Sequence, residues 1–429
     1  MWVLFIIRLF TMLEQFNRKL LGVVILGLIL RTGSVLMFSG AHFDIDSYLI
    51  VAKSVQNHQN IYITAPNRYP YFPGWAVFEV GALYLAQYSG VPFDIIIRLP
   101  GVVADTAIIL VLYAIVDRGY TDTLITPIKA STLHAINPVA IMVIGAHGMF
   151  DSIPILSMLL CGLLLFEGNH RIAATILGIG IVIKQVPLLF GLLFLIMCAS
   201  NKERAEFAFL SALPTGVLSI PFLIISPLVY LNRTIGFEGG PILGWYRELS
   251  LIHGKLPGMT LGHLGDQILA AWPVVQSINT PLLVIPLMLS ISYLFYQNRE
   301  LLNIWTCIAI SILGFYTVSA ALHPEYLYWI APFLSLVSIN KLWSKIYIVF
   351  LFLTGSSWYI WIGQMDIKYI DVLQPIFGIQ PELISLYIFA FSNLAFWALS
   401  LVGVLLCLHR VQIKLRRLPL LGLSGRISR

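Results

Sequence analysis

The stretch from Ala41 to Trp75 reads AHFDIDSYLIVAKSVQNHQNIYITAPNRYPYFPGW, and it is the polar segment around which the rest of the chain is arranged. It follows the first long apolar run, and Asp44 and Asp46 stand at its start. Carboxylates beside an apolar run lose hydration, a cost that a chain mostly accepts where chemistry or an ion needs the charge. The segment closes with RYPYFPGW, whose aromatic rings with polar tips favour an interface between water and lipid.

The composition of the whole chain is that of a polytopic membrane protein. Of 429 residues, 59% are hydrophobic and 11% charged, and the mean hydropathy is +0.88. Soluble domains carry about 25% charged residues, so we expect an all-α membrane protein without a separate soluble domain. The net charge of +6 gathers in short loops and at the tail, as on a cytoplasmic membrane face, and does not indicate nucleic acid.

The basic loops also predict the topology, with about twelve crossings and both termini in the cytoplasm. After an amphipathic lead (Met1–Lys19) and a first span (Leu20–Phe38), the segment Trp75–Tyr88 is the difficult one. Its length of about 21 Å falls short of the ~30 Å hydrocarbon layer. If it is interfacial or re-entrant, every short basic loop faces the cytoplasm. The remaining expected spans are Pro100–Val116, Ala130–Ala146, Ser152–Phe166, Ala173–Gly191 with the apolar run after it as an out-and-back pair around Lys184, Phe207–Tyr230, Leu282–Tyr296, Leu301–Ala320, Leu327–Ile339, Ile346–Ile362 and Leu383–Leu408.

This topology places most of the unusual polar residues at the outer face. A secondary transporter more often carries such residues near the membrane midplane, in two related halves, and we see no internal repeat. A one-sided polar chamber beneath a long loop instead predicts an active site open to the outer face. The outer residues are Asp44, Asp46, Arg68, Arg98, His147, Asp151, Lys184, Arg233, Arg247, His253, Lys255, His263, His323 and Glu325.

Two polar stretches lie at the ends of expected spans. In RLPGVVAD, which opens a span, Arg98 precedes Asp105 by two helical turns, and an Arg–Asp pair, a helix cap or a direct role explains them. GAHGMFDS (145–152) joins two spans, and its glycines let the backbone approach a ligand closely. His147 and Asp151 in this turn could bind a proton, an ion or a sugar hydroxyl, although a residue at a helix end is often only a cap.

Three further features place charge inside apolar runs. Arg31 lies in the outer half of the first span and either snorkels to the interface or serves the site. Lys184 in IKQVP is costly at that depth without an anion such as a lipid phosphate, although the carbonyls freed by a proline could also hold it. In LHPEYLYW, a helix start explains Glu325, and His323 is the surplus feature.

Taken in order, these motifs resemble the GT-C glycosyltransferases, polytopic enzymes that take a sugar from a polyprenyl-phosphate carrier. The likeness is strongest to the dolichyl-phosphate-glucose glucosyltransferases of N-glycan assembly, with prokaryotic mannosyl- and arabinosyltransferases as a second comparison. In that family an acidic residue opens the first outer loop, as Asp46 does in HFDIDSY with Asp44 beside it. A YPP-type turn closes the loop, and RYPYFPGW takes that place with a wider proline spacing.

Four further motifs continue the resemblance over about the first two hundred residues and then near His323. The family's arginine-to-aspartate stretch is matched by IRLPGVVAD, and its short histidine turn by GAHGMFDS. Its lysine–glutamine pair in a broken helix is matched letter for letter by Lys184 and Gln185. Its late His-x-Glu element is matched by HPEY, which supplies His323 and Glu325.

The resemblance implies an inverting hexosyl transfer, of mannose or glucose, at the outer membrane face. Asp46 is the first choice for the base that activates the acceptor hydroxyl, and Asp44 is the alternative. Lys184, Arg98 and Arg31 are candidate cations for the leaving phosphate, and His147 and His323 would position sugar or phosphate. The full expected substrate-binding set is Arg31, Arg98, Asp105, His147, Asp151, Lys184, Gln185, His323 and Glu325.

The expected partners are a polyprenyl- or dolichyl-phosphate-sugar donor, a glycan, lipid or protein acceptor, and membrane lipid of a plasma or ER-type membrane. No cofactor is implied; Asp44, Asp46 and Asp151 could gather around a divalent metal, but the resemblance does not require one. We expect a GT-C module in residues 1–230 with its catalytic loop at 41–75, an acceptor-selecting loop in 231–280, and variable helices in 281–429. A lipid-linked sugar flippase, a secondary transporter and a catalytically idle subunit are the alternatives.

Overall fold

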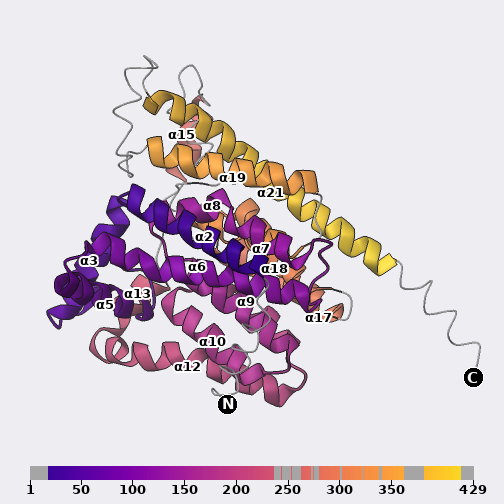
Figure 1. The fold of residues 1–429 in the computed structure, drawn as a ribbon, viewed down its shortest axis with the longest axis horizontal. Helices are drawn as coiled ribbons and strands as arrows, with labels where there is room; N and C mark the ends of the chain where they lie inside the picture. Colours follow the sequence, from indigo (N-terminus) through magenta and orange to yellow (C-terminus); the bar gives the residue numbers. More distant parts are fainter. Residues whose placement is uncertain are drawn as a thin grey trace, which may run out of the picture.

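The computed structural model describes residues 18–235, 243, 253, 262–271, 274, 280–299, 302–320, 322–337, 341–361 and 381–416. Within these residues every regular element is a helix, which confirms the expected all-α class (Figure 1). The amphipathic lead before residue 18, most of the 231–280 loop and the basic tail after residue 416 lie outside the described residues. The division into three regions therefore stays a prediction.

The polar opening segment folds into short helices at one end of the bundle. They are α2 (Arg18–Met37), α3 (His42–Gln56), α4 (Ile61–Thr64) and α5 (Gly74–Ser89). Gly40 adopts a φ of +83° between α2 and α3, and this turn places the Asp44 helix directly after the first long helix. With its 16 residues, α5 extends about 24 Å, so its interfacial or re-entrant placement stays a prediction.

The helix expected over Ala130–Ala146 is broken, which corrects the prediction of one straight span. The elements here are α6 (Phe93–Asp117), α7 (Pro127–Ala135), α8 (Pro138–Ala140), the π-helix η1 (Ile141–His147) and α9 (Ser152–Phe166). Pro138 has no N–H and disfavours helical geometry at Asn137, whose side chain accepts hydrogen bonds from the next helix start. The two halves are bent by 41°.

The expected span Ala173–Gly191 is broken at Lys184, and the predicted out-and-back crossing of the membrane around this residue stays a prediction. The elements are α10 (His170–Ile183), α11 (Val186–Met197), α12 (Asn201–Ile225) and α13 (Pro227–Thr234). Arg171 Nε donates to Glu206 Oε2 at 2.8 Å, and the α-carbon of Gly178 packs against Ser211 of α12. Since α10 and α12 therefore run in the same direction, α11 carries the chain back between them, and Lys184 lies at the turn.

The segment expected as a span over Leu327–Ile339 is not an α-helix in its described part. Prolines at 324 and 332 interrupt it, and it forms short 3-10 turns that neighbouring helices bury. Irregular backbone at membrane depth is tolerated where protein surrounds it. The later elements are α15 (Gly262–Ala270), η2 (Thr280–Val284), α17 (Ile285–Gln297), α18 (Ile304–Val318), η3 (Pro324–Tyr328), η4 (Phe333–Ser335), α19 (Lys341–Trp361) and α21 (Pro381–Arg416).

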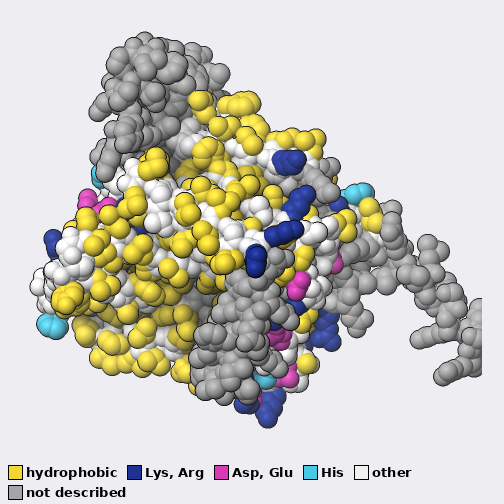
Figure 2. Space-filling model, viewed as in Figure 1, with side chains coloured by type: hydrophobic (Ala, Val, Ile, Leu, Met, Phe, Trp, Pro, Cys, Tyr) yellow, Lys and Arg dark blue, Asp and Glu magenta, His cyan; other side chains and the backbone are white. Residues whose placement is uncertain are grey.

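Several helices are suited to a membrane. In the described part of the chain, α2, α6, α12 and residues 388–413 of α21 are long and apolar enough to cross one, and the bent α7–η1 unit would be a fifth. Figure 2 shows hydrophobic side chains over much of the visible face, with most Lys and Arg toward its right-hand side. The chain is thus an integral membrane protein, and the count of about twelve crossings stays a prediction.

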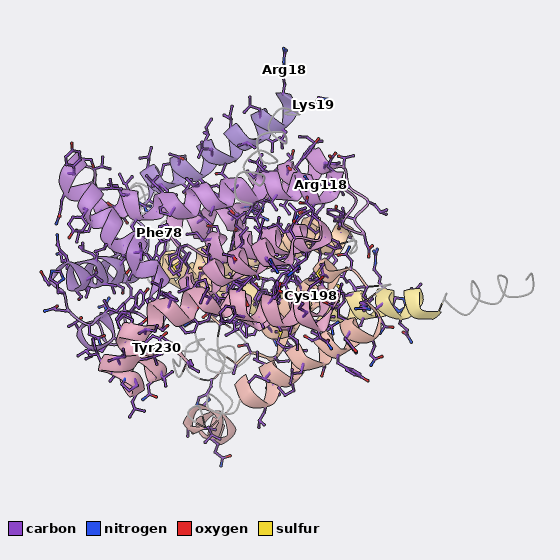
Figure 3. All side chains as sticks on the ribbon, turned by 90° about the horizontal axis from the view of Figure 1, so that it is seen from below. Arg18, Lys19, Phe78, Arg118, Cys198 and Tyr230 are labelled. Carbon is purple, nitrogen blue, oxygen red and sulfur yellow. The ribbon has the colours of Figure 1, made fainter. Side chains whose placement is uncertain are left out.

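The two ends of the bundle differ in character. In Figure 3, Arg18, Lys19 and Arg118 lie toward one end, and Phe78 of α5 and Tyr230 of α13 lie at the other. Figure 1 places α3, α5 and α13 together at that second end, while α19 and α21 pair along one edge. The start of the polar opening segment and the Lys184 turn are therefore brought to the same end.

Candidate functional site

Asp44 forms an acid–base pair with His147. The Asp44 carboxylate (Oδ2) lies 2.8 Å from His147 Nε2, and the backbone N–H of Ala41 donates to the His147 carbonyl at 2.9 Å. The Asp44 side chain is 25% exposed, whereas His147 is buried at 2%. The second carboxylate oxygen of Asp44, Oδ1, has no partner among the described residues, so Asp44 can accept a further hydrogen bond from a ligand.

Asp46 lies elsewhere on α3. Residues two apart on an α-helix are rotated by about 200°. Asp46 is exposed and makes no hydrogen bond or ion pair within the described chain, in contrast to Asp44. The structure therefore separates the two carboxylates that the sequence places together.

Lys184 lies between two carboxylates from distant parts of the chain. Its Nζ donates to Asp151 Oδ2 at 2.7 Å, and it lies 4.0 Å from Glu325 Oε1. Trp329 Nε1 also donates to Asp151, at 2.6 Å, so Asp151 is no helix cap although it precedes α9. We call Lys184, Asp151 and Glu325 the Lys184 cluster; it joins the start of α9, the α10–α11 turn and η3.

Aromatic rings surround the Lys184 ammonium. Its Nζ lies 5.4 Å from the ring centre of Tyr71, 5.3 Å from Phe150 and 5.6 Å from Tyr326. Ring faces attract cations at these distances. Trp329 stacks on Tyr326 with centroids 4.2 Å apart. These four aromatic residues were not among the predicted site residues, although each lies in or beside one of the predicted motifs.

Tyr71 connects the Asp44 pair to the Lys184 cluster. Burial and then the nearby charges of Glu325, Asp44 and Asp151 raise the pKa of Tyr71 well above its ordinary value. The hydroxyl is therefore a protonated donor, and it has no hydrogen-bond partner among the described residues. The turn that carries it is fixed, because Tyr62 Oη donates to the Tyr71 carbonyl at 2.9 Å.

A second buried cluster is bonded mainly within itself; His134 Nδ1 is its one buried side-chain polar atom without a hydrogen-bond partner among the described residues. Arg31 Nε donates to Asp105, and its other nitrogens donate to the carbonyls of Ala135 at 2.7 Å and His134 at 3.0 Å. His134 Nε2 lies 2.9 Å from Asp105 Oδ1, and the Tyr328 hydroxyl also donates to Asp105. We call Arg31, Asp105, His134 and Tyr328 the Arg31 cluster.

The Arg31 cluster changes the interpretation of two predicted substrate-binding residues. Both partners of the Arg31–Asp105 pair have 0% side-chain exposure. Arg31 does not snorkel, and Asp105 pairs with Arg31 rather than with Arg98. His134, which the sequence analysis did not single out, completes this cluster.

Arg98 is also hydrogen-bonded by groups of the protein itself. It pairs with Asp94 at 2.9 Å and donates to the Phe38 carbonyl at 2.8 Å, with 0% side-chain exposure. Gly148 has a φ of +92°, and a Cβ there would lie 2.6 Å from Arg98 Cδ. The Gly148 backbone therefore approaches a protein side chain where the sequence suggested a ligand.

Gln185 and His323 complete the predicted set. Gln185 Nε2 donates to the Pro70 carbonyl at 2.7 Å and the Thr234 carbonyl at 3.1 Å, so it ties the aromatic turn to α13. His323 Nε2 is buried without a hydrogen-bond partner in the described chain. Its ring lies 5.5 Å from that of Tyr326, beside the Lys184 cluster.

The expected metal-ligand alternative has no matching arrangement in the described residues. No three His, Cys, Asp or Glu side chains there are grouped to hold a metal ion. Asp44 and Asp46 face different directions, and Asp151 is bonded to Lys184 and Trp329.

A helical membrane protein with carboxylates, a lysine and aromatic rings gathered at one end has the features of a membrane-embedded group-transfer enzyme. The comparison with protein families specifies this class: the chain belongs to glycosyltransferase family 87, which it matches over residues 80–320. It is therefore a membrane glycosyltransferase. The match includes His147, Asp151 and Lys184, whereas Asp44 and Glu325 lie outside it. A comparison with curated proteins finds no match for the chain.

Proposed function

We propose that the protein transfers a hexose, mannose or glucose, from a polyprenyl-phosphate carrier to an acceptor hydroxyl at the outer membrane face. The transfer inverts the anomeric centre. The observation that carries the proposal is Asp44, a partly exposed carboxylate with one oxygen unpaired among the described residues, which shares Tyr71 as a neighbour with the Lys184 cluster. Family membership supports the sugar transfer itself.

Asp44 is the general base in this proposal, ahead of Asp46. The acceptor O–H gives its proton to Asp44 Oδ1 while its oxygen bonds to C1 of the sugar. The bond between C1 and the phosphate oxygen breaks, and its electron pair leaves with the lipid phosphate. His147, 2.8 Å from the other oxygen, orients the carboxylate.

Lys184 and His323 are the groups that we assign to the phosphate. Lys184 has three N–H donors, and one of them donates to Asp151. His323 Nε2 has no hydrogen-bond partner in the described chain. Arg98 and Arg31 are bonded to carbonyls and carboxylates, so we now assign them a structural role. Glu325, which accepts no hydrogen bond from the described residues, suits the hydroxyls of the sugar.

The cluster also limits how the phosphate binds. Asp151 and Glu325 place two carboxylates around the single ammonium of Lys184. Sugar hydroxyls donate hydrogen bonds and so suit the Glu325 side of the cluster, whereas the phosphate oxygens accept them and suit the Lys184 side. The donor is therefore expected to bind with its sugar toward Glu325 and its phosphate toward Lys184 and His323.

The test is a transfer assay on purified protein in lipid nanodiscs. Polyprenyl-phosphate-mannose and -glucose are supplied with membrane lipid and glycan acceptors, and mass spectrometry follows donor loss and product gain. Asp44→Asn keeps the acceptor for His147 but removes the base, so turnover should fall about 10²–10⁴-fold. Asp46→Asn is the matched control and should stay within about threefold of wild type.

Three outcomes contradict the proposal. Loss of activity in Asp46→Asn with full activity in Asp44→Asn would return the base to Asp46. Movement of donor across the bilayer without any transfer product would favour a flippase or transporter. Consumption of a sugar nucleotide in place of the lipid donor would overturn the donor assignment.

A further inference from the structure

The short 3-10 helix η3 lies between the two buried clusters. A 3-10 helix has three residues per turn, so residues i and i+3 share one side. Glu325 and Tyr328 are such a pair: Glu325 faces Lys184 at 4.0 Å, and the Tyr328 hydroxyl donates to Asp105. One turn of chain thus connects the Arg31 cluster to the Lys184 cluster.

Side-chain bonds fix η3 more firmly than its own backbone does. The backbone bonds at the two ends of the segment are short-range, from Tyr326 N to His323 O at 3.0 Å and from Trp329 N to Tyr326 O at 2.9 Å. Such bonds have poorer geometry than those of an α-helix. The position of η3 therefore depends on contacts to other elements, of which the Tyr328–Asp105 bond is buried most deeply.

Asp105 is a rigid reference point for that contact. Arg31 of α2 and His134 of α7 both bond to it, and both have 0% side-chain exposure. Arg31 is in turn held by the carbonyl of Gly27 at 3.1 Å and by that of Ala135. Two helices, α2 and α7, therefore hold the α6 carboxylate that receives the Tyr328 hydroxyl.

We propose that Tyr328 is a positioning residue for sugar transfer: its bond to Asp105 sets the register of η3 and so places Glu325 against Lys184. The inference rests on the proposed function in one respect, the role of Glu325 as acceptor for the sugar hydroxyls. The anchoring of η3 itself does not depend on the reaction. The Arg31 cluster then serves the site from a distance, without touching substrate.

The first experiment measures the anchor without catalysis. Tyr328→Phe keeps the ring and removes only the hydroxyl. Tyr347→Phe is the matched control, because Tyr347 is also fully buried and its hydroxyl bonds Ser400 Oγ at 2.8 Å, in the α19–α21 pair. Hydrogen exchange of the 322–331 backbone should speed up about tenfold in Tyr328→Phe and stay unchanged in Tyr347→Phe. Unchanged exchange in both variants overturns the inference.

The second experiment tests whether the Tyr328–Asp105 bond affects the rate of sugar transfer through Glu325. Tyr328→Phe should lower kcat about tenfold at equal folded fraction, because a small misplacement of a positioned group is expensive, and Tyr347→Phe should not. In a Glu325→Gln background the same substitution should cost less than about twofold, since the group that it positions is already altered. Fully multiplicative losses would show that Tyr328 acts independently of Glu325, which overturns the positioning role.

The two experiments separate the possible failures. If wild type transfers no sugar from any polyprenyl-phosphate donor, the proposed function fails, and the exchange measurement still decides whether Tyr328 anchors η3. If transfer is normal and the exchange of η3 does not respond to Tyr328→Phe, the inference fails alone.

Discussion

The Arg31 cluster and the Lys184 cluster are both built from buried charges, yet they differ in spare bonding capacity. Asp105 receives bonds from Arg31, His134 and Tyr328, and Arg31 is occupied by carbonyls from two helices. In the Lys184 cluster, by contrast, Glu325 accepts no hydrogen bond from the described residues, and its lysine contact is 4.0 Å long. Burial of charge alone therefore does not mark a site; what separates these two clusters is that the Glu325 carboxylate can still accept a hydrogen bond from a ligand, whereas Asp105 is occupied by three side chains.

The strongest test of this comparison replaces each buried pair by apolar residues. Replacing both partners of a buried ion pair is often neutral for stability. Arg31→Met with Asp105→Leu should fold and keep transfer within about tenfold of wild type, the loss expected when Tyr328 is released. Lys184→Met with Asp151→Leu should also fold, but transfer should fall about 10²–10³-fold, because the phosphate loses its cation.

The same transfer assay and a thermal unfolding curve measure both variants. Equal loss of activity in the two would erase the distinction between a structural and a catalytic cluster. Full activity in the Lys184→Met, Asp151→Leu variant would remove Lys184 from the proposed mechanism.

A smaller effect comes from single substitutions, which leave a charge without its partner. Asp105→Asn leaves Arg31 buried at 0% exposure beside a neutral group, which should cost about 3–5 kcal/mol of unfolding free energy. Asp151→Asn should cost less, about 1–3 kcal/mol, because Lys184 still has Glu325 and three rings around it. Thermal unfolding in matched detergent compares the two; a larger loss in Asp151→Asn would contradict the assignment.

The smallest predicted effect concerns Glu79 on α5, a buried carboxyl group without a hydrogen-bond partner among the described residues. The side chain is 0% exposed, and neither carboxyl oxygen has a hydrogen-bond partner in the described chain. Burial raises the pKa of Glu79 well above its ordinary value of 4.5. Below that ordinary value both folded and unfolded chains hold the proton, and as the pH rises the unfolded chain loses it first.

Glu79 should therefore make the folded state progressively less stable above pH 4.5. Glu79→Gln removes this dependence. The difference in Tm between Glu79→Gln and wild type should grow from pH 5 to pH 8, by a few degrees in total. A constant difference across that range would show that Glu79 does not ionise on unfolding as expected.

Much of the candidate site follows from sequence because each motif carries its own chemical cost. Lys184 within an apolar run and His147 with Asp151 beside glycines are conspicuous for that reason, and the structure brings these motifs to one end of the bundle. Sequence spacing could not separate Asp44 from Asp46, since two residues on one helix differ only in the direction they face. The aromatic rings around Lys184 were missed because aromatic residues are common throughout a membrane protein.

The sequence by itself determined that this chain is helical, lies in a membrane and places its polar motifs beside apolar runs, because hydropathy and charge are local properties. Only the tertiary structure decided which charged side chains have their hydrogen bonds filled by the protein itself. Arg31, Arg98 and Asp105 look like ligands for a substrate when viewed one motif at a time, yet neighbouring helices fill their bonds. A hydrogen bond depends on partners that are remote in the chain, and those partners are set by packing rather than by the sequence around each residue.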